Sequence, residues 1–260
     1  MARKRTTLTV VGTEQIGPHF VRVHLGDPGF DDFTPIEFTD AYVKLLFDRP
    51  DGEVARTYTV RSVDPIARRI AIDFVVHGDE GIAGPWAANV TVGEQITMFG
   101  PSGAYAPRAD ADWHLLAGDE SALPAISAAV EALPDGATAK VFVEVADAAD
   151  EIAFVSKAQL EVHWIHRGGA AHEVGEDRAG DNAPIIAAVR DAEWLPGRAG
   201  VFIHGEAQAV MHNLRRYIRK ERGVPAEFAS ISGYWRRGRT EESFRVWKRE
   251  LAAAEAGDNA

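Results

Sequence analysis

The first hundred residues alternate between apolar and polar positions with the two-residue period of half-buried β-strands. Turn-forming segments such as Asp27-Pro28-Gly29 and Arg49-Pro50-Asp51-Gly52 separate the alternating runs. Strands are predicted at residues 7–11, 20–25, 42–47, 56–62, 70–77 and 95–99. Six short strands in this length favour a small antiparallel barrel, with one short helix between Gly84 and Val90.

After Pro107, buried strands alternate with amphipathic helices. The predicted strands are residues 113–117, 140–145, 162–166, 201–204 and 228–232, and the helices are residues 122–133, 183–194 and 207–222. This alternation implies right-handed crossover connections and a parallel sheet. A last helix is predicted from Glu241 to about Ala254, with Phe244, Trp247 and Leu251 on one face and Thr240 as its N-cap.

The two patterns together predict a β + α/β protein with two domains. A six-stranded antiparallel barrel is expected over residues 1–109. A parallel-sheet α/β domain of the nucleotide-binding type, ending in the C-terminal helix, is expected over residues 110–260. A chain of 260 residues is long enough for two domains of modest size, each with its own core.

Composition and charge exclude several classes of function. The chain has no cysteine, which excludes disulfides, thiolate-held iron–sulfur clusters, zinc fingers and thiol nucleophiles. No apolar run reaches the roughly 18–20 residues of a membrane helix, and the basic N-terminus lacks a signal-peptide core. A cytoplasmic protein without membrane insertion is therefore expected. The net charge of -11 argues against nucleic-acid binding, although residues 215–249 hold eleven bases against four acids.

Three familiar motifs are missing from the chain. It contains no Gly-Lys dipeptide and hence no P-loop, no G-x-S-x-G nucleophile elbow, and no G-x-G-x-x-G dinucleotide fingerprint. Nucleotide binding through the commonest glycine-rich loops is therefore not indicated, and an α/β-hydrolase is not expected.

The segment Arg56-Thr57-Tyr58-Thr59-Val60-Arg61 combines groups that suit a flat, phosphorylated ligand. On a strand, Arg56 and Tyr58 share one face, while Thr57, Thr59 and Arg61 share the other. A cation, an aromatic plane and a hydroxyl could bind a phosphate, stack on a ring and hydrogen-bond its edge. An ordinary exposed strand of a barrel is the alternative interpretation.

A glycine-rich loop follows soon after this strand. It runs Gly78-Asp79-Glu80-Gly81-Ile82-Ala83-Gly84 and leads into a short helix at Pro85-Trp86-Ala87. Glycines and small residues let backbone N–H groups approach a phosphate, and proline suits a first helical turn. A plain turn is the alternative, but two segments able to bind phosphate so close together make it less favoured.

These segments resemble the flavin-binding barrel of the siderophore-interacting protein family, which comprises ferric-siderophore reductases related to the ferredoxin–NADP reductase superfamily. The resemblance spans nearly the whole chain in the expected order. Its segments are Arg56-x-Tyr58-Thr59-x-Arg61, His77-Gly78, Gly81-x-Ala83-x-x-Trp86-Ala87, Gly100-Pro101-Ser102-Gly103, the run from Leu116 to Ile126, Trp164-Ile165-His166-Arg167, His204-Gly205-Glu206, and the run from Gly233 to Glu241.

The resemblance implies that the barrel binds FAD. Arg56 would hold the pyrophosphate, Tyr58 would lie along the isoalloxazine and the Thr59 hydroxyl would sit near its N5 edge, which makes Tyr58 and Thr59 the candidate catalytic residues. The rest of the FAD site would be lined by His77, Gly78, Gly81, Ala83 and Trp86. Many members of the wider superfamily have serine at the position of Ala83, so one side-chain bond to phosphate is expected to be missing.

The resemblance also implies a nicotinamide site in the second domain, where open parallel sheets bind ligands. Its loop would consist of Gly118, Asp119, Glu120, Ser121 and Ala122. One glycine followed by two acids is a poor pyrophosphate cradle, because the acids repel it. Arg167 could pair with a ribose 2′-phosphate, which would favour NADPH, or could be an exposed loop arginine. NADPH, NADH and a reduced ferredoxin all stay open as electron donors.

The substrate that the resemblance implies is a ferric siderophore, which is often anionic. Candidate cations at its cleft are Lys44, on an otherwise apolar strand, and Arg236, Arg237 and Arg239 after the last strand. Each could equally be a solvated surface base. The leading function is an FAD-dependent ferric-siderophore reductase. The alternatives are a general flavin or ferric-chelate reductase, a non-catalytic ferric-siderophore-binding protein, and a nucleic-acid binder that uses the basic tract.

Overall fold

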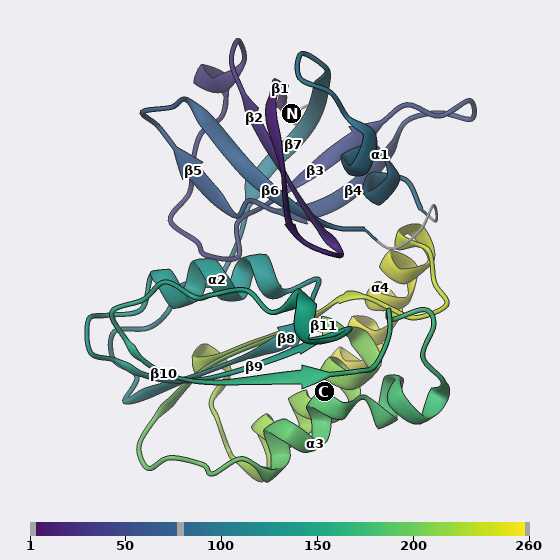
Figure 1. Ribbon diagram of the computed structural model, residues 1–260. Helices are drawn as coiled ribbons and strands as arrows, with labels where there is room; N and C mark the ends of the chain where they lie inside the picture. The colour runs from purple at the N-terminus through teal and green to yellow at the C-terminus, as the bar shows by residue number, and fades with distance from the viewer. Residues whose placement is uncertain (1–3, 77–80, 258–260) are drawn as a thin grey trace.

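The computed structural model of the protein describes residues 4–76 and 81–257, with side chains up to Leu251, and consists of two domains (Figure 1). The N-terminal domain is one antiparallel sheet with the strand order β4-β3-β7-β1-β2-β6-β5. Its elements are β1 (Arg5–Gly17), β2 (Phe20–Gly26), β3 (Tyr42–Phe47), β4 (Val54–Thr59), β5 (Ser62–Asp64), β6 (Arg69–Val75), α1 (Ala83–Asn89) and β7 (Gln95–Ser102).

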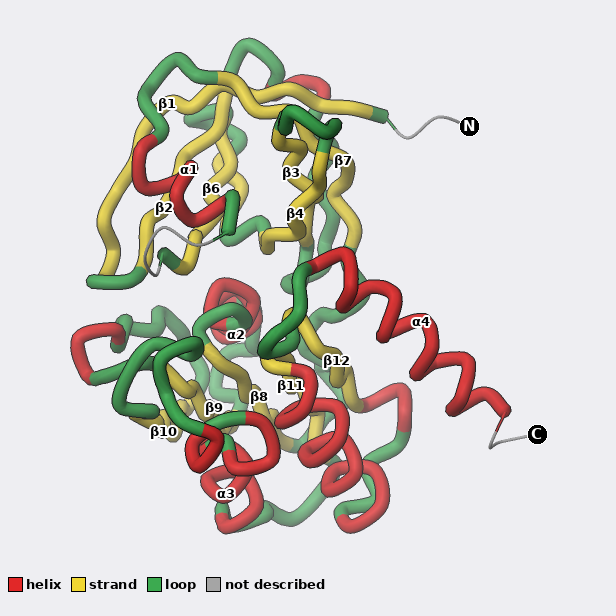
Figure 2. Tube along the Cα trace, turned by 90° about the vertical axis from the view of Figure 1, so that its right-hand side faces the viewer, coloured by secondary structure: helices red, strands yellow, loops and turns green. Residues whose placement is uncertain are grey.

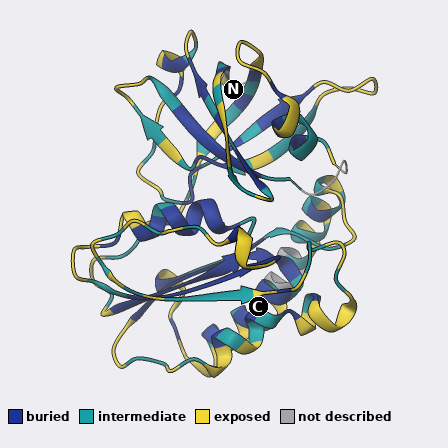
Figure 3. Cartoon of the chain, in the orientation of Figure 1, coloured by how far each residue is buried: buried dark blue, intermediate teal, exposed yellow. Residues whose placement is uncertain are grey.

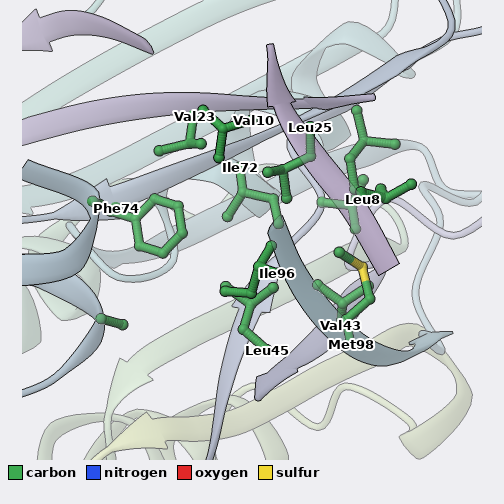
Figure 4. Close-up of a cluster of buried hydrophobic side chains, with 14 of the residues drawn as sticks. Leu8, Val10, Val23, Leu25, Val43, Leu45, Ile72, Phe74, Ile96 and Met98 are labelled. Atoms are coloured by element: carbon green, nitrogen blue, oxygen red, sulfur yellow. The ribbon is translucent and has the colours of Figure 1, made fainter. Parts of the chain in front are cut away.

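Alternate residues of these strands point into a single core, as the period of two predicts. Val43 and Leu45 on β3 are fully buried, as are Val23 and Leu25 on β2 and Ile72 on β6. Figure 4 shows their side chains converging from different strands. Burial of this apolar set from every side gives the curled sheet its barrel form and supplies its main stabilisation.

The N-terminal sheet contains seven strands and not the predicted six. The strand expected at residues 56–62 is broken, because Val60 N donates to Ala41 O at 2.7 Å whereas Arg61 N donates to Ala71 O at 2.8 Å. The chain thus leaves β3 at Val60 and joins β6 one residue later, where β5 pairs with β6. This crossing brings the two edges of the sheet together.

The second domain has the predicted parallel sheet, with the strand order β10-β9-β8-β11-β12. Its strands are β8 (Trp113–Asp119), β9 (Thr138–Val145), β10 (Gln159–His166), β11 (Ala199–Glu206) and β12 (Ala229–Trp235). The helices are α2 (Leu123–Glu131), α3 (Pro184–Asp191) and α4 (Glu241–Gly257). The predicted helix at 207–222 is present but is wound more widely than an α-helix over Gln208–Leu214 and Tyr217–Glu221.

Helices cover both faces of this sheet. Helix α2 lies between the sheet and the barrel, and α3 lies on the opposite face (Figure 1). The central strands β8 and β11 are buried along their whole length (Figure 3). Near-continuous apolar strands are what a parallel sheet covered on both faces requires.

Polar side-chain contacts join the barrel to the second domain. Arg61 makes a bidentate pair with Glu131 of α2, and His19 Nδ1 lies 2.9 Å from the buried Asp150 carboxylate. The barrel ends with β7 at Ser102 and the parallel sheet starts with β8 at Trp113, so the expected boundary at 109/110 falls in the connecting segment. Within the described residues, no helix is both long and apolar enough to cross a membrane.

Candidate functional site between the two domains

Strand β4 presents its polar side chains at the edge of the barrel that faces the second domain. The pairing of β4 with β3 sets Thr57 opposite Lys44 and Thr59 opposite Tyr42, so these four side chains share one face. Arg56 and Tyr58 belong to the other face, as the strand period predicts. Strand β4 is an edge strand of the hydrogen-bonded sheet.

Tyr58 is supported by an aromatic group. Its ring centre lies 4.4 Å from that of Phe74, and Phe74 lies 5.5 Å from Trp86. Burial raises the pKa of the Tyr58 phenol, and the Glu241 carboxylate adds to this effect, so the phenol stays neutral at physiological pH. The structure therefore brings together Tyr58 and Trp86, two of the aromatic residues expected at the flavin site.

The glycine-rich loop enters α1 beside β6. Gly81 has a φ of +83°, and a Cβ there would meet no atom of the described residues within 4 Å, whereas a Cβ on Gly84 would lie 3.2 Å from Val75 O. Ala83 is buried and contributes no polar group at the start of α1. His77 and Gly78, which the resemblance also assigns to this site, lie outside the described residues.

The second domain reaches β4 through Tyr234, which the sequence prediction did not include among the site residues. The Tyr234 phenol lies next to the Thr59 hydroxyl. Burial raises the pKa of that phenol, and the nearby hydroxyl partly opposes this effect. Thr59 is itself buried. The edge of the Tyr234 ring packs on His204 of β11, with ring centres 4.8 Å apart. The aromatic residues that follow the last strand in the sequence were the one available signal for this contact.

Asp119 organises the carboxyl edge of the parallel sheet. Its buried carboxylate accepts hydrogen bonds from Ser121 N, Ser121 Oγ, Glu206 N and Trp235 Nε1, at 2.5–2.9 Å. These donors belong to the loop after β8 and to the ends of β11 and β12. Burial, with a contribution from Glu120, raises the Asp119 pKa. Gly118 is required by packing, because a Cβ there would lie 2.3 Å from His204 O.

Arg167 is buried inside this edge, with 3% of its surface exposed. Its Nη1 atom donates to Glu144 Oε1 and to Glu120 Oε2, each at 3.0 Å. Burial raises the pKa of Glu144 to about 7, partly offset by the bond from Ile185 N and by Arg167. The guanidinium thus faces two carboxylates and not solvent, so its position gives no support to binding of a 2′-phosphate.

The four candidate substrate cations have different surroundings. Lys44 is half-buried on β3, and Arg239 is exposed. Arg237 holds the loop after β10, because its terminal nitrogens donate to Ala171 O and Val174 O at 2.6 and 2.5 Å. Arg236 lies over the ring of Trp247, 4.4 Å from its centre. Arg237 and Arg236 therefore have structural contacts that the sequence did not reveal.

The groups on β4 and around it suit FAD. Arg56 is a cation for a pyrophosphate, the supported Tyr58 ring offers a flat surface, and the hydroxyls of Thr57 and Thr59 offer polar contacts to a ring edge. Gly81, with a φ of +83°, carries no Cβ that would keep a phosphate from the backbone. The residues present therefore fit the group that the resemblance implies.

Comparison with known proteins finds family models that match both domains. A family model described as siderophore-interacting protein matches residues 111–238, and one described as siderophore-interacting FAD-binding domain matches residues 9–55 and 48–105. The uncharacterized protein Rv2895c of Mycobacterium tuberculosis is 57% identical over 95% of this chain and 96% of its own length. The ferric vibriobactin reductase ViuB of Vibrio cholerae is 34% identical, covering 74% and 68%. An NADPH-dependent ferric-chelate reductase of Escherichia coli is 27% identical, covering 88% and 91%.

Solved structures agree with both the fold and the family. A siderophore utilization protein from T. fusca superposes with a TM-score of 0.81 at 36% identity, covering 92% of this chain and 95% of that one. The ferredoxin reductase of carbazole 1,9a-dioxygenase, at 15% identity, has a TM-score of 0.63 over 90% of this chain and 68% of its own, and shows the same two-domain reductase fold. The chain belongs to the siderophore-interacting protein family.

Proposed function

We propose that this protein is an FAD-dependent ferric-siderophore reductase that takes electrons from a nicotinamide nucleotide. The observation that carries the proposal is the proximity of the Thr59 hydroxyl on β4 to the Tyr234 phenol at the end of β12. It brings the strand with the flavin-binding signature to the carboxyl edge of a parallel sheet, which is where such sheets bind nucleotides. The two expected binding sites are therefore adjacent, as electron transfer between their ligands requires.

FAD would supply the conversion of a two-electron hydride into single electrons, which ferric iron requires. Overall, one nicotinamide reduces two ferric ions to ferrous ions, and one proton is released. Ferrous iron is a poorer match for the hard oxygen ligands of a siderophore, so reduction lets the metal leave.

The residues of β4 have separate roles in this proposal. Arg56 balances the charge of the pyrophosphate, and Tyr58, supported by Phe74, orients the ring and excludes water from one side. Thr59 presents its hydroxyl at the ring edge, held in place by Tyr234. The remaining FAD contacts are assigned to His77, Gly78, Gly81, Ala83 and Trp86.

In the second domain, Asp119 fixes the loop from Gly118 to Ala122 against β11 and β12, which positions the proposed nicotinamide site. Arg167 is a positioning residue for that loop, because its Nη1 atom donates to the Glu120 carboxylate. For the ferric siderophore, Lys44 is the cation on the same face of the barrel as Thr57 and Thr59. Arg236, Arg237 and Arg239 are proposed to add positive charge further out.

The test is anaerobic reduction of the FAD-loaded protein by NADPH, NADH or reduced ferredoxin, followed by addition of ferric siderophores and simpler ferric chelates. Bleaching of the flavin absorbance by a donor, then recovery as a ferrous trap fills, is the expected result. Recovery with simple chelates but not with siderophores would favour a general ferric-chelate reductase. Tight binding of ferric siderophore without any flavin reduction would overturn the proposal in favour of a binding protein.

A further inference from the structure

Helix α4 bridges the two domains. Near its middle, Lys248 Nζ donates to Ser232 Oγ and to Gly233 O of β12, each at 3.0 Å. Its first two turns lie against β4 of the barrel, where Arg245 Nη2 donates to Ala55 O at 3.4 Å. Figure 2 shows the helix starting beneath β4 and running along the side of the second domain. The first turn therefore occupies the edge of the barrel where the flavin-binding signature lies.

The acidic residues of this first turn contact that signature directly. Glu242 Oε1 accepts a hydrogen bond from Arg56 Nη1 at 2.6 Å, and Glu241 Oε2 lies 3.9 Å from Arg56 Nε. Glu241 Oε1 also accepts from Thr57 Oγ1 at 2.9 Å. Two carboxylates thus surround the arginine that is proposed to hold the FAD pyrophosphate.

Both carboxylates are fixed by the start of the helix. Thr240 Oγ1 accepts a hydrogen bond from Ser243 N at 3.3 Å and caps α4, as predicted. The same cap sets Glu241 and Glu242 in the first turn, where acidic residues suit the helix dipole. Arg245, one turn later, holds Glu241 Oε1 at 2.5 Å. The start of the helix therefore holds the negative charges of Glu241 and Glu242 beside the Arg56 guanidinium.

We infer that Glu241 and Glu242 occupy the anion-binding side of Arg56 until the pyrophosphate of FAD replaces them, so the first turn of α4 leaves β4 as FAD binds. This inference rests on the proposed FAD site. The two carboxylates already engage the Arg56 guanidinium, and a pyrophosphate placed beside them would be repelled by their like charge. The Lys248 contacts are at the other domain and are independent of this exchange.

The exchange makes the two acids determinants of FAD affinity. Molecules in which Glu241 and Glu242 hold Arg56 cannot bind the pyrophosphate there. The apparent dissociation constant for FAD is therefore the intrinsic constant divided by the fraction of molecules in which Arg56 is available. Glu242 is about half exposed, with 54% of its side chain accessible, so its contact with Arg56 is solvent-screened. Removing both charges is expected to tighten FAD binding about fivefold.

The test compares the double variant Glu241→Gln, Glu242→Gln with the wild type by flavin-fluorescence titration of the apoprotein. Glu250→Gln, an exposed charge on the same helix, is the matched control. Riboflavin, which has no phosphate, is the matched ligand. FAD is expected to bind the double variant about fivefold more tightly than the wild type. The double variant should bind riboflavin as the wild type does, and Glu250→Gln should bind FAD as the wild type does. Hydrogen exchange of residues 241–245 in the wild type should accelerate with FAD and not with riboflavin.

Unchanged or weaker FAD binding in the double variant would overturn the inference, as would FAD-induced protection of residues 241–245. If the double variant folds poorly, Glu242→Gln alone serves, because it retains the contacts of Glu241 with Thr57 and Arg245. Arg56→Ala separates the two proposals. If Arg56→Ala loses FAD affinity while the glutamine variants gain none, the replacement of Glu241 and Glu242 is rejected and the FAD site at Arg56 is retained. Unchanged affinity in Arg56→Ala would remove the proposed site of the pyrophosphate itself.

Discussion

The hydroxyl of Thr59 in the barrel lies beside the phenol of Tyr234 at the end of β12. Thr59 is buried, and the second domain packs on β4 at this point. This contact therefore links the two domains at a polar edge of the proposed flavin site.

A double-mutant cycle measures this link. Thr59→Val and Tyr234→Phe each remove one hydroxyl with little change of shape, so the pair should show a coupling of about 1 kcal/mol in the free energy of unfolding. Urea denaturation of the apoprotein is the measurement. If the two substitutions change the free energy of unfolding additively, within about 0.3 kcal/mol, the two hydroxyls do not interact.

Arg56→Ala should weaken FAD binding roughly ten- to a hundredfold, since a charge-assisted contact to phosphate contributes about 1.5–3 kcal/mol. Lys44→Ala, a cation on the neighbouring strand, is the control and should leave FAD affinity nearly unchanged. Fluorescence titration with FAD and with riboflavin gives the comparison. Equal FAD affinities of the two variants would reject the role of Arg56.

The sequence predicted the elements because each rests on a local pattern. The alternation in β1 to β7 and the long apolar strands of the second domain are properties of consecutive residues. The break between β4 and β5 is different, because it depends on Val60 and Arg61 finding the carbonyl groups of Ala41 and Ala71. Those partners are set by how the barrel closes, which no pattern within residues 56–62 contains.

The site was predicted only where its residues are close in sequence. Arg56, Tyr58 and Thr59 lie within one strand, so their combination is visible. Thr57 and Glu241 are 184 positions apart and meet only after α4 has docked on β4. The same limit applies to Arg167, whose burial between Glu120 and Glu144 depends on three separate segments. A charged residue in the sequence does not reveal which distant residue it will pair with in the folded protein.

Asp119→Asn should destabilise the protein by about 2–3 kcal/mol, because an amide NH₂ would then face buried N–H and O–H donors. The carboxylate accepts from Glu206 N and Trp235 Nε1 at 2.7 and 2.8 Å, both on its Oδ2 atom. Asp110→Asn removes an exposed carboxylate that pairs with Arg108 and should change stability by less than about 1 kcal/mol. Chemical denaturation of both variants decides; similar losses would mean that Asp119 is not the organiser of this edge.

His204 gives the folded state a defined pH dependence. Burial lowers its pKa to about 3, while the ordinary value is 6.5. Since the folded pKa is depressed, the unfolded chain takes up a proton first, and stability is lost as the pH falls below 6.5. Phenylalanine would keep the stacking on Phe202, whose ring centre is 4.0 Å away.

Lowering the pH from 8 to 5 should therefore reduce the unfolding free energy of the wild type by about 2 kcal/mol more than that of His204→Phe. Urea denaturation at the two pH values measures it. His114, whose pKa burial also lowers, is present in both proteins and cancels. A difference that does not change with pH would show that His204 is protonated equally in the folded and unfolded chains.

Lys44 tests how an acidic protein accepts an anionic ferric siderophore. The net charge of -11 should repel a multiply negative chelate unless a local cation opposes the field. Lys44 lies on the face of the barrel that carries Thr57 and Thr59, so we expect Lys44→Ala to raise the KM for an anionic ferric chelate about fivefold. Arg236→Ala should have a smaller effect, because its guanidinium already lies over Trp247.

The comparison that isolates charge is stopped-flow reoxidation of the reduced protein by anionic and by neutral ferric chelates. Only the anionic chelate should react more slowly with Lys44→Ala, and higher salt should shrink the difference from wild type, because partly exposed charges are screened over about 10 Å at 0.1 M. Lys157→Ala, an exposed base that pairs with Asp135, is the surface control. The nicotinamide is proposed to bind in the other domain. The rate of flavin reduction should therefore be the same in the wild type, Lys44→Ala and Lys157→Ala. Equal losses with both chelates would assign Lys44 to the barrel structure and not to substrate binding.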